Sequence, residues 1–138
     1  MAPGCVFCGV VAGEVPAHTV HRDAGVLAIL DHRPLFPGHV LVLPLEHRPH
    51  LADIPPEAVG PFFATVRELA EAVEEAMEAH GTFVAINNKV SQSVPHLHVH
   101  VVPRRFKDGL RGFFWPRQRY PGGDEEMATV ATAIRRFL

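Results

Sequence analysis

The chain has 138 residues, a net charge of −2, 47% hydrophobic residues and 20% charged residues. We predict a single soluble domain over residues 1–138, with a core at about 5–105 and a C-terminal tail and helix at 106–138. The small net charge gives no reason to expect nucleic-acid or membrane binding, and no stretch approaches 18 uninterrupted apolar residues. We expect a cytoplasmic protein, because "MAPGCVFCGVVAGEV" lacks the features of a signal peptide and the two cysteines lie too close together to staple a fold.

Short β-rich segments recur along most of the chain. The stretch "CVFCGVVAGEVP" is expected to hold a short helix that ends near Gly13. Strands are expected at residues 18–23, 25–31, 39–46, 82–87 and 96–103. Between the first two strands, Asp23-Ala24-Gly25 indicates a hairpin turn.

Two segments have the pattern of helices. Residues 55–80 carry apolar side chains at helical spacing, and Pro61 leads us to expect that the regular helix starts only there, after a preceding turn. Residues 124–138 begin with acids and end with arginines, which suits the helix dipole. Several antiparallel strands with one long inserted helix predict an α+β fold.

Three histidines alternate in "SVPHLHVHVVPRR". In a strand His96, His98 and His100 share one face, while Leu97 and Val99 face the core. A single metal ion bound by all three imidazoles is disfavoured. At about 3.3 Å per residue, the Cα atoms of His96 and His100 would lie roughly 13 Å apart, too far for both rings to reach one ion with His98. A merely solvated face usually mixes Thr, Lys and Glu, so three imidazoles favour a chemical role.

A polar loop precedes the histidines. The stretch "INNKVSQSV" can offer donors to phosphate oxygens from Asn87, Asn88, Lys89, Ser91, Gln92 and Ser93. A neutral imidazole is a competent nucleophile toward phosphorus at neutral pH. Together the two features indicate covalent phosphoryl or nucleotidyl transfer.

The stretch "HLHVHVV" resembles the signature of the histidine triad (HIT) family, and "LAILDHRPLFPGHVLVLPLEHRPHL" and "QSVPHLHVHVVPR" occur in the family's order. The resemblance implies a five-stranded antiparallel sheet with one long helix, and a homodimer. It also implies that His98 attacks the α-phosphorus of a nucleotide, giving a nucleotidyl-histidine that water then hydrolyses. His100 and His39 would contact the phosphate and hold the geometry of the site.

The same resemblance implies a set of nucleotide-binding residues. Asp31 would bind the ribose hydroxyls, Leu30 and His32 would lie near the base, and Gln92 and Ser93 would bind phosphate. The loop "NNKVSQS" is shorter than is usual in the family and has Ser91 where glycine is usual. Either Asn87 or Asn88 could therefore take the phosphate-contacting role.

The spacing Cys5-x-x-Cys8 is by itself weak evidence, since two small buried thiols would explain it equally well. Many HIT proteins bind zinc through such a pair and two histidines, and the matching positions here are His47 and His96. We therefore expect one structural Zn²⁺. His50 is a nearby competitor for the role of His47.

The segment "RRFKDGLRGFFWPRQRY" mixes arginines with aromatic residues. Such mixing can bind single-stranded nucleic acid, but an irregular tail that packs its aromatic residues on the body is the more frequent case. In a third interpretation, its arginines receive the outer phosphates of a polyphosphate substrate.

The predicted function is hydrolysis or transfer at a nucleotide α-phosphate, with a small-molecule dinucleoside polyphosphate or purine nucleoside phosphoramidate as substrate. Two alternatives stay open at this point. The enzyme could be a phosphorylase, in which phosphate replaces water, or the protein could be a nucleotide-sensing or scaffolding module with incidental turnover.

Overall fold

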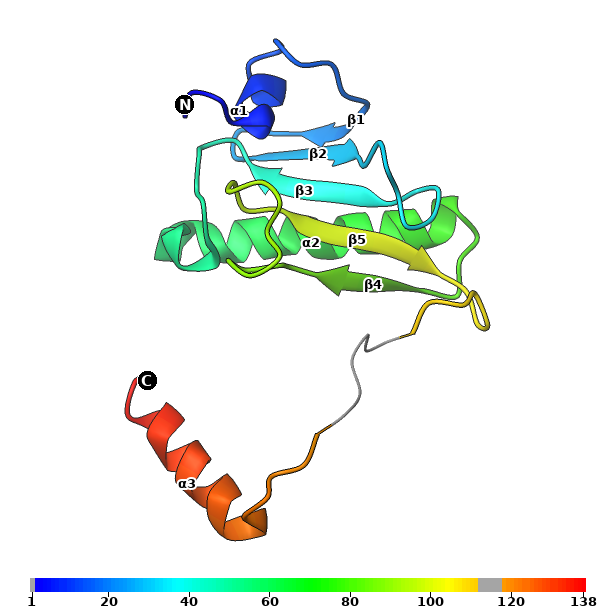
Figure 1. The fold of residues 1–138 in the computed structure, drawn as a ribbon. Coiled ribbons are helices and arrows are strands. Elements are labelled where there is room, and N and C mark those ends of the chain that lie inside the picture. The colour runs from blue at the N-terminus through cyan, green and yellow to red at the C-terminus, as the bar shows by residue number, and fades with distance from the viewer. Residues whose placement is uncertain (1, 112–117) are drawn as a thin grey trace. The chain divides into compact units, whose positions relative to one another are not determined.

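The computed structural model describes residues 2–111 and 118–138. Its central feature is a five-stranded antiparallel sheet in the order β1-β2-β3-β5-β4 (Figure 1). The strands are β1 (Thr19–Arg22), β2 (Val26–Leu30), β3 (Val40–Pro44), β4 (Gly81–Ala85) and β5 (Val99–Arg104). The helices are α1 (Val6–Val11), a 3-10 turn η1 (Leu51–Asp53), α2 (Pro56–Ala76) and α3 (Gly123–Arg135). The predicted α+β fold is confirmed.

The chain divides into two compact units, Met1–Asp108 and Gly109–Leu138. The first contains the whole sheet with α1 and α2, and the second contains α3. α3 has acids in its first turn and Arg135 in its last, as the sequence predicts. None of the helices in the described parts of the chain is long and apolar enough to cross a membrane.

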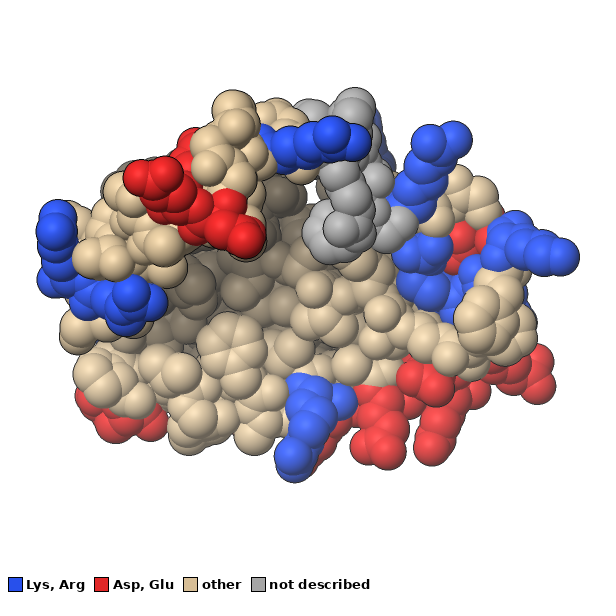
Figure 2. All heavy atoms as spheres, turned by 90° about the horizontal axis from the view of Figure 1, so that it is seen from below, with Lys and Arg blue, Asp and Glu red and all other residues tan. Residues whose placement is uncertain are grey.

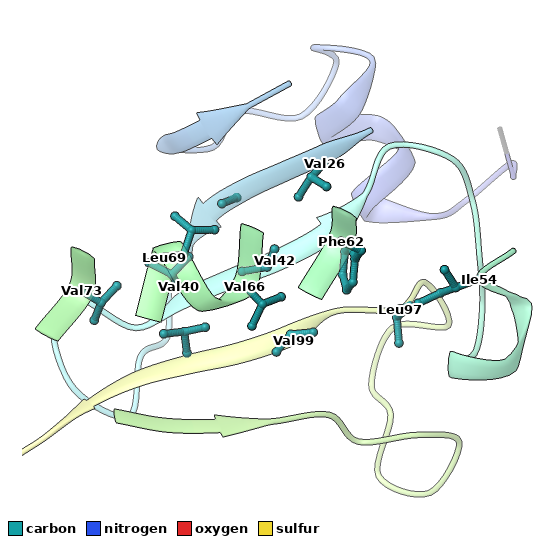
Figure 3. Packing of buried hydrophobic residues seen from close by; sticks show 12 residues of the cluster. Val26, Val40, Val42, Ile54, Phe62, Val66, Leu69, Val73, Leu97 and Val99 are labelled. Carbon is teal, nitrogen blue, oxygen red and sulfur yellow. The ribbon is translucent and has the colours of Figure 1, made fainter. Parts of the chain in front are cut away.

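One face of the sheet packs against α2 (Figure 3). The buried side chains of the helix are Phe62, Val66, Leu69 and Val73, one or two per turn on a single stripe. They meet buried residues of three neighbouring strands and the segment before β5: Val26, Ala28, Val40, Val42, Leu97, Val99 and Val101. Glutamates occupy much of the outer surface of α2, and acidic side chains form a row along the lower edge of the body in Figure 2, where this helix lies.

The opposite face of the sheet is also covered. Phe7 of α1 packs in a second cluster with Leu27 and Ile29 of β2 and Leu41 and Leu43 of β3. Because β2 and β3 bury both faces, their buried positions run almost continuously instead of alternating. The alternating histidines described below lie on this second face.

α2 begins earlier than the sequence predicts. The helix starts at Pro56, with Pro55 at its N-cap, and Pro61 lies inside it, so the expected start at Pro61 is wrong. Pro61 lies in the second turn, where its missing N–H removes one hydrogen bond without ending the helix. The buried Phe62, which is 3% exposed, anchors this turn in the core.

β5 begins later than predicted. The strand starts at Val99, so His96 and His98 precede its paired part and His100 lies within it. The backbone N–H of Leu97 donates instead to the carbonyl of Arg48, at 2.7 Å. The side chains nevertheless alternate as predicted, because Leu97 and Val99 point into the core against α2.

Candidate active site and metal centre

The register of three strands brings distant residues together. Leu30, the last residue of β2, pairs with Val40 at the start of β3, and Val40 pairs with Val101 of β5. Asp31 and His39 therefore lie side by side just beyond the ends of β2 and β3, where the Asp31 N–H donates to the His39 carbonyl at 2.9 Å. This arrangement places both next to His100.

The triad histidines are buried or partly buried. His96 is 0% and His98 is 5% exposed, which rules out a solvated polar face. The His98 ring lies edge-on to Phe7 at 5.0 Å and to His100 at 5.1 Å, measured between ring centroids. The His98 ring therefore packs against an apolar ring on one side and an imidazole ring on the other.

His98 has one ring nitrogen committed to the backbone. Its Nδ1 lies 2.8 Å from the carbonyl oxygen of His96. A carbonyl oxygen only accepts hydrogen bonds, so Nδ1 carries the proton of the neutral ring and Nε2 holds a free lone pair. His98 thus has the tautomer that a nucleophile at Nε2 requires.

His39 and His100 form a hydrogen-bonded pair. His39 Nε2 lies 2.9 Å from His100 Nδ1 and 3.7 Å from an Asp31 carboxylate oxygen. Burial lowers the pKa of His100 to about 4, helped by His98 and His39 and opposed by Asp31. Burial also lowers the pKa of His39, again opposed by Asp31. Both imidazoles are neutral at pH 7.

A cavity of about 750 Å³ opens in front of these residues. Its polar wall includes five of the residues predicted from the sequence: Asp31, His32, Ser93, His98 and His100. Its apolar wall includes Leu30, also predicted, and side chains from α1, among them Val6, Phe7 and Val10. This volume is within the range of small-molecule sites.

Sequence reasoning missed the contribution of α1 and of His18. Phe7, Val6, Val10 and His18 all line the cavity. One available signal was the predicted metal site itself, because linking Cys5 and Cys8 to His96 brings the intervening helix beside the triad. No pattern in the sequence pointed to His18.

The loop before the triad is held by its own side chains. Asn88 accepts from the N–H of Leu51 at 3.0 Å, and Gln92 donates to the carbonyl of Pro49 at 2.6 Å while accepting from the N–H of Lys89 at 2.9 Å. Of the predicted phosphate-binding residues, it is Ser93 that lines the cavity, while Asn87, Asn88 and Gln92 do not appear in its wall. Asn88 and Gln92 thus fasten the loop to residues 49–51.

Four side chains form a potential metal centre on the same face. The ligand atoms of Cys5, Cys8, His47 and His96 all lie within 4.8 Å of one another. His47 Nδ1 lies 3.3 Å from the Cys8 sulfur, and His96 Nδ1 lies 3.5 Å from the Cys5 sulfur. The competitor His50 instead lies at the N-cap of η1, with its Nδ1 3.5 Å from Asp53.

The donor set of this cluster fits zinc. His96 Nε2 donates to the carbonyl of Pro44 at 2.8 Å, which leaves the Nδ1 lone pair directed at the two sulfurs. Two thiolates and two imidazoles are a common closed ligand set for structural zinc. Burial raises the pKa of the Cys5 thiol, so a bound cation would be needed to favour its thiolate.

The arginines that precede the tail have partners of their own. Arg104 pairs with Asp108 through two hydrogen bonds of 2.6 and 3.0 Å, and Arg105 donates to the carbonyl of Met77. Both residues lie at the far end of β5 from the triad. Phe113, Phe114, Trp115 and Arg117 of the predicted basic-aromatic segment lie outside the described residues.

The fold and the alternating histidines are those of a known family of proteins. The model of the HIT domain family matches residues 12–107, and the chain belongs to this family. An uncharacterized HIT-like protein of Mycobacterium tuberculosis is 45% identical over 77% of this chain and 75% of its own length.

Relatives with named activities act on nucleotides. An adenosine 5'-monophosphoramidase of Schizosaccharomyces pombe is 28% identical over 94% of this chain and 95% of its own length. A bis(5'-nucleosyl)-tetraphosphatase from the same organism is 36% identical over 68% of this chain and 53% of its own length.

Solved structures agree with this assignment. The Streptococcus mutans protein SMU.412c has a TM-score of 0.89 at 30% identity, covering 99% of this chain and 86% of its own. A Zn-bound histidine triad family protein of Mycobacterium smegmatis has a TM-score of 0.73 at 38% identity, covering 97% of this chain and 95% of its own.

The lowered pKa values of His39 and His100 predict that the folded state loses stability in acid. An unfolded chain protonates these histidines near pH 6.5, whereas folded His100 resists protonation down to about pH 4. The free energy of unfolding should therefore fall as the pH drops from about 6.5 toward 4, by at most about 1.4 kcal/mol per pH unit for each such group. Urea unfolding of wild type and His100→Gln at pH 7 and pH 5 measures this. An equal pH dependence in both proteins would contradict the assignment to His100.

Proposed function

We propose that this protein hydrolyses nucleotides at the α-phosphate through a covalent nucleotidyl intermediate on His98. The observation that carries the proposal is the hydrogen bond from His98 Nδ1 to the His96 carbonyl, at 2.8 Å. It leaves the Nε2 lone pair of a cavity-lining imidazole free to attack phosphorus.

The reaction is a double displacement. In the first step His98 Nε2 forms a bond to the α-phosphorus, and the bond to the leaving group breaks with its electron pair going to that group. The leaving group takes up a proton as it departs. Water then attacks the same phosphorus and gives up a proton, releasing the nucleoside monophosphate and returning the electron pair to Nε2. Two in-line displacements retain configuration at phosphorus overall.

The other cavity residues supply binding and charge stabilisation. Ser93 and His100 are suited to donate to the non-bridging phosphate oxygens. Asp31 accepts from the N–H of Arg33 with one carboxylate oxygen, so the other is suited to the ribose hydroxyls. Leu30, His32 and the apolar side chains of α1 would enclose the base.

We infer a small leaving group rather than a long polyphosphate from the surroundings of Arg104 and Arg105. Outer phosphates need cations, and Arg104 and Arg105 are engaged with Asp108 and Met77 at the far end of β5. A nucleoside phosphoramidate makes no such demand. The monophosphoramidase named above supports this choice, while the tetraphosphatase keeps dinucleoside polyphosphates as the second candidate.

His98→Ala should abolish turnover while nucleotide binding survives. Removing the nucleophile should lower kcat by several orders of magnitude, since water must then attack directly. We would measure hydrolysis of adenosine phosphoramidate and of diadenosine tri- and tetraphosphate, with and without inorganic phosphate, and AMP affinity by calorimetry. His21→Ala, which changes a half-buried imidazole on β1 that lies 2.8 Å from an Asp23 carboxylate oxygen, is the matched control.

Each result of this panel has a distinct meaning. A His98→Ala protein near the wild-type rate would refute the covalent mechanism. Nucleoside diphosphate formed only with phosphate present would identify a phosphorylase. Tight AMP binding without turnover by the wild type would favour a nucleotide sensor.

We also propose that Cys5, Cys8, His47 and His96 hold one structural Zn²⁺. The proposal is supported by the proximity of their four ligand atoms and by the zinc-bound relative from Mycobacterium smegmatis. A closed four-ligand site would tie the N-terminal segment to the segment before β5.

Metal analysis should find about one zinc per chain for a filled site of this kind. Cys8→Ser should lose the metal and lower the Tm, because thiolates contribute strongly to binding and metal binding stabilises the folded state. His50→Gln, which changes the neighbouring imidazole, should retain the metal and should lower the Tm much less than Cys8→Ser does. A metal-free wild type whose Tm is unaffected by Cys8→Ser would refute the site.

A homodimer is the assembly we propose. β4 is an edge strand of the sheet, and its Val84 is exposed, as are Val59 and Phe63 of α2. Unpaired strand edges and exposed apolar side chains favour association. The cytoplasmic location also stays a prediction, which cell fractionation would test.

Light scattering during size-exclusion chromatography should give twice the mass of one chain. Val84→Asp should shift the protein toward the monomer, because a charge on the edge strand opposes pairing. Val90→Asp changes an even more exposed valine in the loop before the triad and should leave the mass unchanged. A monomeric wild type would contradict the proposal.

A further inference from the structure

A backbone donor determines the protonation of His39. The N–H of Leu35 donates to His39 Nδ1 at 3.0 Å. Only an unprotonated ring nitrogen accepts such a bond, so the neutral His39 carries its proton on Nε2. Unlike a side chain, this backbone N–H cannot reverse its role or lose its proton.

The direction of the next hydrogen bond follows from the first. His39 Nε2 lies 2.9 Å from His100 Nδ1, and the proton between them belongs to His39. The reverse direction would leave His39 without a proton on either nitrogen, which a neutral imidazole does not allow. The neutral His100 therefore carries its own proton on Nε2.

We propose that His39 is a positioning residue that holds His100 in the tautomer whose Nε2–H is a neutral donor to the substrate phosphate. Its role toward phosphate rests on the function proposed above, whereas the tautomer itself does not. Two imidazoles on one segment would thus have opposite tautomers. His98 presents a lone pair at Nε2, and His100 presents a proton at Nε2.

The surrounding charges agree with a neutral relay. A protonated His39 would place an Nδ1–H against the N–H of Leu35, and a protonated His100 would place an Nδ1–H against His39 Nε2–H. Burial and the neighbouring imidazoles lower the pKa values of both groups in the same sense. The Asp31 carboxylate lies 3.7 Å from His39 Nε2, which is too far for a hydrogen bond. It therefore does not compete with His100 as the acceptor of the His39 Nε2–H.

The same three residues could be mistaken for a metal site, since the ligand atoms of Asp31, His39 and His100 lie within 4.8 Å of one another. An ion on His39 Nε2 would require the proton to move to Nδ1. There it would oppose the backbone N–H of Leu35. The cluster is therefore better explained as a directed chain of hydrogen bonds.

Long-range ¹H–¹⁵N spectra of the histidine rings test the tautomers directly, with signals assigned from single His→Gln variants. In the wild type at pH 7, we expect the proton on Nε2 for His39 and His100 and on Nδ1 for His98. His39→Leu removes the donor, so His100 should become a mixture of tautomers. His39→Gln places an amide N–H near the former Nε2 and should preserve the His100 tautomer.

Kinetics should follow the tautomer. Loss of one hydrogen-bond donor to the transition-state oxygens lowers kcat by about 10²–10³-fold. In His39→Leu only a fraction of the His100 rings would carry the proton on Nε2, so kcat should fall by about tenfold or more, with a smaller change in KM. His39→Gln should recover most of the loss. A purely structural role for His39 would not produce this difference between variants of equal Tm.

Two results would overturn the proposal. One is a wild-type His100 protonated on Nδ1, which can be seen even if His39→Leu does not fold. The other is a folded His39→Leu protein with an unchanged His100 tautomer and unchanged kcat. Absence of turnover on every nucleotide would refute the proposed function alone, because the spectra require no substrate.

Discussion

Burying imidazoles obliges each ring N–H to find an acceptor, and this requirement organises the site. Among the described residues, no buried side-chain nitrogen or oxygen lacks a hydrogen-bond partner. His96 donates to the carbonyl of Pro44, His98 to the carbonyl of His96, and His39 to His100. Each donation assigns one nitrogen and so determines what the other nitrogen can do. We propose that three chemically identical side chains, those of His96, His98 and His100, thereby take the roles of metal ligand, nucleophile and donor.

α1 connects the proposed metal centre with the proposed nucleophile, His98. Phe7 lies between the two cysteines in the sequence, and its ring packs edge-on against His96 at 5.8 Å and His98 at 5.0 Å between centroids. The same residue lines the cavity and belongs to the second apolar cluster of the sheet. Because interiors are closely packed, a shift of this helix would displace the His98 ring. Stability of the N-terminal segment and geometry of the site are therefore linked.

The loop before the triad combines unusual backbone angles with side-chain hydrogen bonds that hold it in place. Lys89 and Ser91 have positive φ angles of 71° and 61°, a conformation that non-glycine residues adopt at some cost. The side chains of Asn88 and Gln92 offset this cost by fastening the loop to residues 49–51. Ser93 then emerges at the cavity wall.

Much of the architecture could be predicted from the sequence, because local patterns carry it. Alternation of Leu97 and Val99 with the histidines, the helical spacing of Phe62 and Val66, and the Asp23-Ala24-Gly25 turn need no distant partner to be recognised. The site residues were grouped by resemblance to a family. The start of α2 could not be predicted, since the cost of Pro61 is outweighed by the burial of Phe62 against the sheet.

The sequence by itself determined which residue types are available: two cysteines and two histidines of the kind that bind metal, three alternating imidazoles and a polar loop. Only the tertiary structure decided which ring nitrogen of each imidazole is left free. The His96 carbonyl and the Leu35 N–H lie close in sequence to the rings that they orient, but Pro44 lies 52 residues from His96 and His39 lies 61 residues from His100. A ring's tautomer depends on the hydrogen-bond partner that the fold places beside it, and for His96 and His100 no local pattern of residues encodes that partner.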